Sequence, residues 1–584
     1  MVLSSVTEEG PSLLLIEGCL TTVAIAVTFC WPRIGARWFS RVEHAFGRLA
    51  REKSLSVAVV GLAALLLRLA ILPICPIPRP FIHDDFSFLL AADTFASGRL
   101  TNPTPAMWMH FETFHITMWP TYMSMYFPAQ GLVLAAGKVL AGNAWFGLLI
   151  VTALMCGAIC WMLQAWLPPT WALLGGMLAV LRLGLFSYWI NTYAGAASIA
   201  ALGGTLMLGA LPRFMKGVRL RDGLLLATGV ILLGTCRLYE GMLLCLPVAF
   251  VLVWWIFFGK NRPAATLLLR RTVVPLTLIV AAGAWMGYYD YRVFGSPTRL
   301  PYTVNRAQYG VAPYFVWQSQ RTAPLYRHEV MRKFYEKQEL DEFQKIHNIA
   351  GFVPQTLLKA AAGILFYAGI VLLVPLIMLP RAFGDRRIRF LVVCVFVLIA
   401  GQLIEIYLFP HYLAPFTAAF YAIGLQAMRH LRLWQPDNQP VGLTLTRMIV
   451  SLCIALAAVR LCAESLHVGI PAWPGPWSST WYGSDNRSGA TRAQIESRLE
   501  QAPGRQLVIV KYSPDHNSLD EWVYNAADID DSKVVWARYM SEAENLELIR
   551  YYKDRTVWLV QPDMKPASVS LYPSLAQQSA NAVR

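Results

Sequence analysis

The chain has 584 residues, of which 56% are hydrophobic and only 15% charged, with a mean hydropathy of +0.45. Soluble domains carry roughly 25% charged residues, so this composition excludes a soluble enzyme, a coiled coil, a disordered chain and a secreted disulfide scaffold. The net charge of +15 lies largely in short segments between apolar runs, where it sets membrane orientation and does not indicate a nucleic-acid partner.

Apolar runs long enough to cross a bilayer recur over the first four-fifths of the chain. They predict twelve membrane spans, and a weaker apolar stretch at 128–141 predicts a partial or re-entrant helix. The expected spans are 11–31, 55–74, 144–166, 170–190, 193–211, 222–236, 241–258, 272–289, 357–379, 389–408, 412–429 and 447–463. The ten cysteines lie almost all inside these runs and indicate apolar packing, not a disulfide framework.

The Lys and Arg residues predict the orientation of the chain. Five basic groups separate expected spans, at 33–53, 213–221, 260–271, 381–389 and 429–447. With twelve spans all five lie on one side, which the positive-inside rule assigns to the cytoplasm. Both termini and the loops 75–127 and 288–356 then lie on the periplasmic side of the plasma membrane.

The composition changes abruptly near residue 463, so we expect a transmembrane catalytic part at 1–463 and a periplasmic α/β domain at 464–584. A linker at 471–489 separates them. Within the tail, 506–512 and 556–562 have the pattern of short buried strands, and 490–502 and 540–553 have helical periodicity. The tail contains no glycine-rich phosphate loop, and no chemistry is assigned to it.

An acidic pair follows the second expected span, in the sequence His83-Asp84-Asp85-Phe86. Asp is favoured at a helix start, so one interpretation is a cap or a solvated turn. The other is a carboxylate that serves as a general base at the outer membrane boundary. Neighbouring residues project in divergent directions, which argues against two carboxylates flanking one bond as in glycoside hydrolases.

The sequence after His83 reads HDDFSFLLAADTFASG, and YFPAQGLVLAAG follows it. This resembles the first external loop of the membrane-embedded GT-C glycosyltransferases, particularly the protein O-mannosyltransferase-like and aminoarabinose-transferase-like branch. The family pattern has an acidic pair, an aromatic residue, a Gly and a Pro, which correspond here to Asp84-Asp85, Phe88, Gly98 and Pro128. The second acid is Asp where Glu is usual, and one additional apolar span precedes the usual first one.

Two later segments are similar to motifs of the same family, and the resemblance covers roughly residues 55–430. CRLYEG at 236–241 resembles its Arg-x-Tyr-Glu-Gly segment, and FPHYLAP at 409–415 resembles its basic-Tyr-x-x-Pro segment, with His where Arg is common. The resemblance implies a site for the donor phosphate and lipid formed by Arg237, Tyr239, Glu240, His411 and Tyr412. The alternatives are an ion pair at a helix junction and a hydrogen-bonded interfacial histidine.

The resemblance implies an inverting glycosyltransferase. A sugar would pass from a polyprenyl-phosphate donor to an acceptor hydroxyl on the external face. The phosphate leaving group needs positive charge, which Arg237 and His411 would supply. Asp84 would be the base, and Asp85 would orient the acceptor, a backbone turn or a cation. Whether the acceptor is a glycan, a lipid or a protein, and which sugar is moved, stay open.

Further external residues are weaker candidates for substrate binding, with turn-forming or loop packing as the alternative. They are His83, Asn191, Tyr193, Asn305, Gln308 and Tyr309. No cofactor is required by the pattern, but a divalent metal stays open, with Asp84, Asp85 and His83 as ligands and His110, Glu112 and His115 nearby. Two other functions stay open: a polyprenyl-lipid transporter or flippase, and a non-catalytic lipid-binding protein of the envelope. A transporter typically shows two related halves, and this sequence shows no internal repeat.

Overall fold

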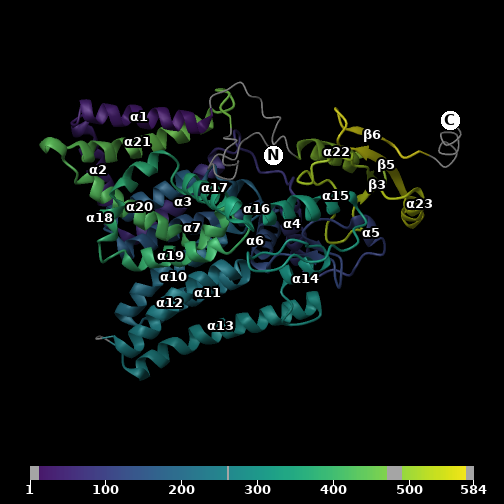
Figure 1. The fold of residues 1–584 in the computed structure, drawn as a ribbon, viewed down its shortest axis with the longest axis horizontal. Coiled ribbons are helices and arrows are strands. Elements are labelled where there is room, and N and C mark those ends of the chain that lie inside the picture. The colour runs from purple at the N-terminus through teal and green to yellow at the C-terminus, as the bar shows by residue number, and fades with distance from the viewer. Residues whose placement is uncertain (1–11, 260–261, 470–488, 574–584) are drawn as a thin grey trace.

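The computed structural model describes residues 12–259, 262–469 and 489–573. A helical bundle forms most of the molecule, and a small sheet lies at the other end of its longest axis (Figure 1). The expected linker at 471–489 lies, apart from Gly489, outside the described residues.

Each of the twelve predicted spans contains a helix, and the predicted fold class is confirmed. Among the described residues, eight helices are long and apolar enough to cross a membrane. They are α1 (Leu13–Cys30), α3 (Lys53–Ala70), α7 (Trp145–Trp166), α10 (Ala197–Gly217), α12 (Leu238–Phe258), α13 (Ala265–Phe294), α17 (Ile349–Tyr367) and α21 (Val441–Leu461). The chain is therefore a multi-pass integral membrane protein.

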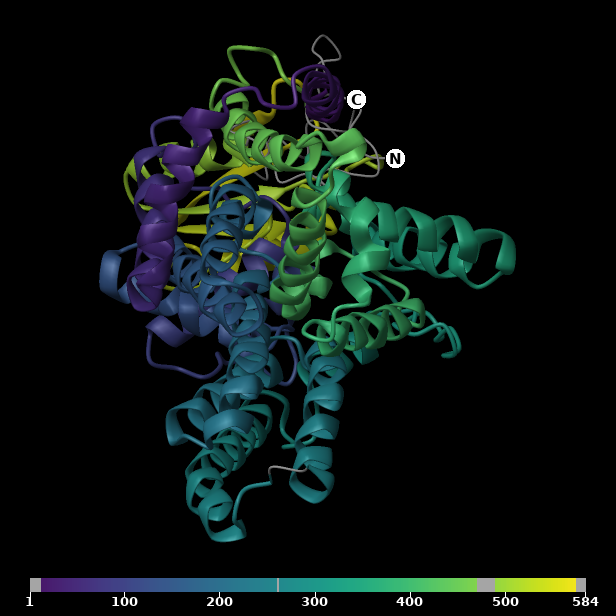
Figure 2. The ribbon, with the colours of Figure 1, turned by 90° about the vertical axis from the view of Figure 1, so that its left-hand side faces the viewer.

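The remaining predicted spans form shorter helices. These are α8 (Pro169–Ala179) with the π-turn η1 (Val180–Gly184), α11 (Leu220–Cys236), α19 (Arg389–Leu403) and α20 (Thr417–Arg432). The weak stretch at 128–141 is α6 (Pro128–Ala141). Short elements join them: α2 (Ala36–Arg51), α9 (Tyr188–Asn191), α18 (Leu379–Phe383), η4 (Pro410–Phe416) and η5 (Pro436–Asn438). Helix α11 packs along α10, and α13 packs on α11 at the margin of the bundle (Figure 1). In Figure 2 this group of helices lies at the lower end of the molecule.

One predicted span, 357–379, is broken into two elements. Helix α17 ends at Tyr367, and the 3₁₀ helix η3 (Val371–Met378) follows a turn in which Gly369 has a left-handed φ of 58°. The buried Glu17 of α1 accepts hydrogen bonds there from the backbone N–H groups of Ile370 and Val371, at 2.9 and 3.2 Å. A helix break inside a membrane is tolerated when its freed backbone groups find partners, so the additional first helix stabilises this break.

The two long loops at 75–127 and 288–356 contain short elements of their own. The first loop forms α4 (His83–Ala96), α5 (Trp108–Phe111) and the hairpin of β1 (Ile116–Thr117) and β2 (Met123–Ser124). The large loop forms α14 (Pro301–Gln308), α15 (Glu329–Lys333), the π-helix η2 (Phe334–Glu339) and α16 (Leu340–Ile346). Helix α4 packs along α6, which fixes the acidic pair against the helical bundle.

The tail folds around a four-stranded sheet in the order β4-β3-β5-β6. The strands are β3 (Arg505–Val510), β4 (Val534–Arg538), β5 (Arg555–Gln561) and β6 (Ser568–Leu571). Strand β3 pairs parallel with β4 and β5, and β6 closes the sheet antiparallel to β5. Helices α22 (Ala490–Gln501) and α23 (Glu542–Tyr551) accompany it. Both predicted strands and both predicted helices are present; β4 and β6 were not predicted.

The sheet packs directly on the first long loop, 75–127. Leu90, Phe111 and Tyr122 of that loop share one hydrophobic cluster with Leu507 and Ile509 of β3. The loop that carries the acidic pair is therefore held between the bundle and the tail.

Candidate active site

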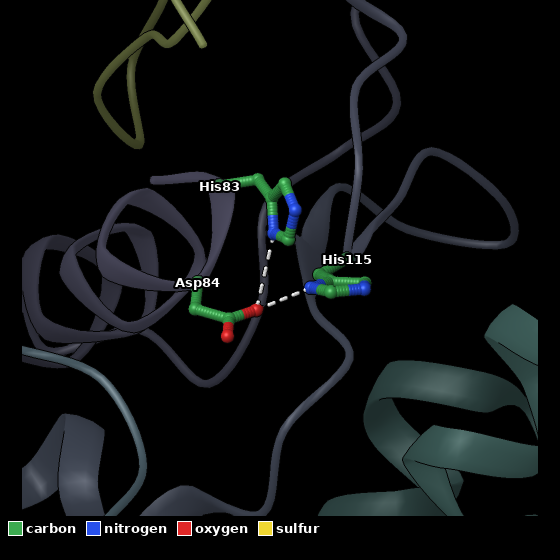
Figure 3. Close-up of side chains that lie close together, drawn as sticks. All are labelled: His83, Asp84 and His115. Carbon is green, nitrogen blue, oxygen red and sulfur yellow. Dashed lines mark hydrogen bonds and ion pairs between the residues drawn. The ribbon is translucent and has the colours of Figure 1, made fainter. Parts of the chain in front are cut away.

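Asp84 lies in the first turn of α4, where the helix dipole favours a carboxylate. Its Oδ1 accepts a hydrogen bond from Nδ1 of His83 at 3.2 Å and another from Nδ1 of His115 (Figure 3). The hydroxyl of Tyr126 donates to the same oxygen. Among the described residues, Oδ2 of Asp84 has no hydrogen-bond partner. The side chain is 29% exposed, so a substrate hydroxyl can reach it.

The surroundings of Asp84 keep it ionised. Burial would raise the pKa of this carboxyl, but the imidazoles of His115 and His83 more than offset that effect and hold it well below its usual range. At neutral pH the group is a carboxylate with one oxygen available to accept a proton.

Asp85 is fully buried and points the other way. Its Oδ1 accepts the backbone N–H of Tyr193 at 2.9 Å, and its Oδ2 accepts that of Phe81 at 3.4 Å. Burial raises the pKa of Asp85 to about 7, against the lowering effect of these hydrogen bonds. Of the three roles left open by the sequence, the structure shows the orientation of backbone turns.

Two predicted substrate residues also bond within the protein. The hydroxyl of Tyr193 donates to the carbonyl of Pro78 at 3.0 Å. The amide of Asn191 donates to the carbonyls of Leu185 and Ser187 and accepts from Arg68. The two side chains therefore hold the proline-rich segment at 73–80 and the turn of α9 in place around Asp85.

Arg237 lies at the junction of α11 and α12. Its Nε and Nη2 donate to the carbonyl of Gly195 at 3.2 and 2.9 Å, and its Nη1 donates to Glu240 at 3.2 Å. The guanidinium lies 4.4 Å from the ring centre of Tyr412, within cation–π range. Burial would lower the pKa of Arg237, but Glu240 and the tyrosines raise it, so the group is a permanent cation.

His411 does not supply the positive charge expected of it. Its Nδ1 lies 2.9 Å from the hydroxyl of Tyr188, which also accepts the backbone N–H of His411 at 3.0 Å. Burial, and then the charge of Arg237, hold the pKa of His411 well below its usual range. The imidazole is neutral at pH 7. Tyr239 turns away from this site and donates to the carbonyl of Gly401 at 2.8 Å.

Two tyrosines that the sequence analysis did not single out lie between Asp84 and Arg237. Tyr126 bonds to Asp84 and stacks on Phe88, with ring centres 4.3 Å apart. Tyr302 of α14 packs 5.6 Å from the ring of Tyr126 and contributes to the electrostatic environment of Arg237. A signal was available, because Tyr126 precedes Pro128 and Tyr302 opens the polar-aromatic segment at 301–318.

The other predicted loop residues lie apart from Asp84. Asn305 is fully buried, and neither polar atom of its side chain has a partner among the described residues. Gln308 donates to the carbonyl of Trp119 at 2.6 Å, and Tyr309 donates to Glu112 at 2.9 Å.

Of the residues considered as metal ligands, only His83, Asp84 and His115 form one group in the described part of the chain. Ligand atoms of His83, Asp84 and His115 all lie within 4.8 Å of one another (Figure 3). Nε2 of His83 is also buried without a partner among the described residues. Two imidazoles and a carboxylate suit Zn²⁺, Mn²⁺ or Fe²⁺, so these residues fit a divalent cation. Asp85, bonded to backbone groups, is not part of this set.

An apolar cavity of about 560 Å³ lies between α17, η3, α19 and α20. Lys359 and Gln402 give it a polar margin, and the ammonium of Lys359 donates to the carbonyl of Glu405 at 3.0 Å. Leu413 of η4 lines the cavity directly beside Tyr412, which contacts Arg237. The short helix η4 therefore connects this cavity, through Leu413, with the residue that contacts Arg237.

No family model matches the sequence, and no curated protein matches it. Among solved structures, the chain is similar to ArnT from Cupriavidus metallidurans in the apo state, at 12% identity and a TM-score of 0.47, over 86% of this chain and 92% of that one. It is also similar to the Archaeoglobus fulgidus oligosaccharyltransferase tethered with an acceptor peptide, at 11% identity and a TM-score of 0.43, over 86% and 68% of the two chains. Both belong to the GT-C superfamily that the sequence motifs resemble. The likeness assigns no role to any residue of this chain.

Proposed function

We propose that this protein is an inverting glycosyltransferase that moves a sugar from a polyprenyl-phosphate donor to an acceptor hydroxyl on the external face of the membrane. The observation that carries the proposal is the pairing of an ionised, accessible Asp84 with the buried cation Arg237, joined by Tyr126 and Tyr302. An apolar cavity lined by Leu413, the sequence neighbour of Tyr412, supports a place for the lipid tail. In this proposal Asp84 is the base and Arg237 binds the phosphate.

The transfer step needs few groups. The acceptor oxygen attacks the anomeric carbon and gives its proton to Oδ2 of Asp84. The bond between that carbon and the phosphate oxygen breaks, and the electron pair leaves with the polyprenyl phosphate. Attack from the face opposite the phosphate inverts the configuration.

Arg237 stabilises the departing phosphate. An arginine carries five N–H donors, and the bonds to Gly195 and Glu240 use three of them. The two others can bind phosphate oxygens, and a preorganised cation in a water-poor site favours the developing charge strongly. Neutral His411 adds a hydrogen-bonding group beside this cation, and the apolar cavity holds the lipid chain.

The cluster of His83, Asp84 and His115 would hold a divalent cation in the same site. When bound, such an ion supplies positive charge that polarises substrate oxygens. Oδ1 of Asp84 faces both imidazoles, which leaves Oδ2 for the acceptor.

The test uses purified protein in detergent with radiolabelled polyprenyl-phosphate sugars. We expect the wild type to release or transfer sugar and Asp84→Asn to lose this activity. Turnover that survives in Asp84→Asn rejects Asp84 as the base. Labelled lipid that binds without any turnover across the donor panel rejects the transferase and favours the transporter or lipid-binding alternatives.

A further inference from the structure

A second cavity, of about 240 Å³, lies outside the bundle where the first external loop meets the large external loop. Six of its lining residues are Trp108, Glu112, Trp119, Gln308, Tyr309 and Arg327. Its walls are aromatic and its polar groups are few and converge, which is the composition of a small-molecule or glycan pocket.

The polar groups of this pocket are held in place by the protein. The Glu112 carboxylate is 5% exposed, accepts the hydroxyl of Tyr309 at 2.9 Å and lies 3.5 Å from Arg327. Gln308 is fixed through its amide nitrogen, which donates to the carbonyl of Trp119, while its Oε1 is buried without a partner among the described residues. The pocket thus contains an oriented carboxylate, that of Glu112, and a hydrogen-bond acceptor without a partner among the described residues, Oε1 of Gln308.

The aromatic groups provide flat faces. Trp119 is 54% exposed at the rim. The guanidinium of Arg327 lies 4.6 Å from the ring centre of Trp108. An indole face packs well against the C–H face of a pyranose ring, and Trp119 presents such a face at the rim beside the polar groups of the pocket.

We infer that this pocket binds a neutral pyranose unit of a glycan acceptor, at a distance from the reacting hydroxyl. The inference rests on the proposed function and adds the class of acceptor to it. Glu112 and His115 are three residues apart in the sequence, so at most about 10 Å of chain separates the pocket from the Asp84 cluster. An acceptor of more than one sugar unit can occupy the pocket while its terminal hydroxyl reaches Asp84.

The chemistry favours a glycan over a peptide acceptor. An extended peptide is usually held by backbone hydrogen bonds along a free strand edge. Among the described residues lining this pocket none belongs to a strand. Hydroxyl groups of a sugar, in contrast, match the Glu112 carboxylate, the Gln308 amide oxygen and the Arg327 donors.

The test measures binding without any lipid donor, so that it does not depend on turnover. The full-length protein in detergent is mixed with maltotriose, mannotriose or chitotriose, and binding is followed by saturation-transfer difference NMR against a detergent blank. We expect at least one trisaccharide to bind and Trp119→Ala to weaken its affinity about tenfold. Trp317→Ala removes another exposed tryptophan of the external loops and should leave the affinity unchanged.

The inference is overturned if none of the three sugars binds, if Trp119→Ala binds as the wild type does, or if only a Ser/Thr-rich peptide binds. Because Asp84→Asn leaves the pocket intact, it should bind the sugar normally. Sugar binding without donor turnover rejects the transferase and keeps the carbohydrate site. If Trp119→Ala turns over the donor and its KM for the acceptor equals that of the wild type, the pocket is not an acceptor site, whereas the proposed transferase activity stands.

Discussion

The carboxylates of Asp84 and Asp85 are neighbours in the sequence but serve two different parts of the molecule. Successive residues of a helix project about 100° apart. Asp84 therefore faces His83, His115 and the accessible site, whereas Asp85 is buried against the backbone of Phe81 and Tyr193. The structure thus divides the pair into an accessible acid and a buried one.

Substitution of these two acids should separate activity from stability. Asp84→Asn should lower turnover about 10²- to 10⁴-fold, the range of a lost general base, with little change in the thermal midpoint. Asp85→Ala leaves two backbone N–H groups without their acceptor and should lower stability by about 1–3 kcal/mol for each. Both are measured as turnover per folded protein and as unfolding midpoint.

Asp93→Asn is the matched control, because Asp93 lies on the same helix and pairs with Lys138. It should change neither quantity appreciably. An Asp84→Asn protein with full activity, or an Asp85→Ala protein with wild-type stability, contradicts this division.

Arg237 should act mainly on the rate of phosphate departure. Arg237→Gln removes the cation and should reduce kcat about 10²- to 10³-fold, whereas Arg237→Lys keeps a point charge and should retain part of the rate. Arg292→Gln, on exposed Arg292 of α13, is the control. Equal kcat values for wild type and Arg237→Gln would remove this residue from the mechanism.

The histidine cluster makes metal content a direct measurement. We expect about one bound Mn²⁺ or Zn²⁺ per chain after incubation and desalting, measured by elemental mass spectrometry, since two imidazoles and a carboxylate are a suitable donor set. His115→Ala should lose the ion, and His328→Gln, outside the cluster, should keep it. A wild-type protein that binds no ion would leave the histidines as hydrogen-bond donors to Asp84 alone.

The sequence was sufficient for what local patterns determine. Apolar run length located a helix in each expected span, and alternation located β3 and β5, because both depend on neighbouring residues. The motifs located Asp84 and Arg237. Tyr126 and His115 contact Asp84 only because the first loop folds back on itself, and Tyr302 reaches Tyr126 from the large loop. The sequence contained these residues near its motifs, but no local pattern predicts their contacts.

The sequence also could not predict that the imidazole of His411 is neutral. Its charge depends on burial and on the nearby Arg237, both consequences of packing. The break between α17 and η3 likewise depends on Glu17, which is more than 350 residues away in the sequence.

Arg538 of β4 should be the main link between the tail and the loop that carries Asp84 and His115. It is buried, pairs with Glu521 at 2.6 Å and donates to the carbonyl of Glu112 at 2.5 Å. Arg538→Met leaves the buried Glu521 unpaired, and we expect a loss of about 3–5 kcal/mol in chemical unfolding. Arg505→Met breaks an exposed pair with Asp531 and an exposed hydrogen bond to the carbonyl of Asp530, and it should cost less than about 1 kcal/mol.

The double variant Arg538→Met with Glu521→Leu completes this test. Replacing both partners removes the unpaired charge, so most of the lost stability should return. If the double variant is stable but its turnover is lower than that of the wild type, the ion pair positions the first loop, which carries His115. Wild-type stability in Arg538→Met would show that the tail is not anchored through this residue.

His328 should make the protein less stable in acid. Burial, and then the charge of Arg538, lower its pKa to about 3, whereas an unfolded histidine has a pKa near 6.5. The unfolded chain therefore binds a proton between about pH 6.5 and 3 that the folded chain does not. Stability falls as the pH is lowered through this window, by up to about 1.4 kcal/mol per pH unit.

His328→Gln isolates this contribution. An amide can still donate to the carbonyl of Met109, which His328 Nε2 contacts at 2.8 Å, but it does not titrate. Denaturant midpoints measured from pH 7.5 to 5 should fall less steeply for His328→Gln than for the wild type. Converted to the slope of the unfolding free energy against pH, the difference should correspond to at most one bound proton. Exposed His347→Gln should follow the wild-type slope. Parallel slopes for wild type and His328→Gln would mean that this imidazole is not buried in its neutral form, because a histidine protonated in both states adds no pH dependence.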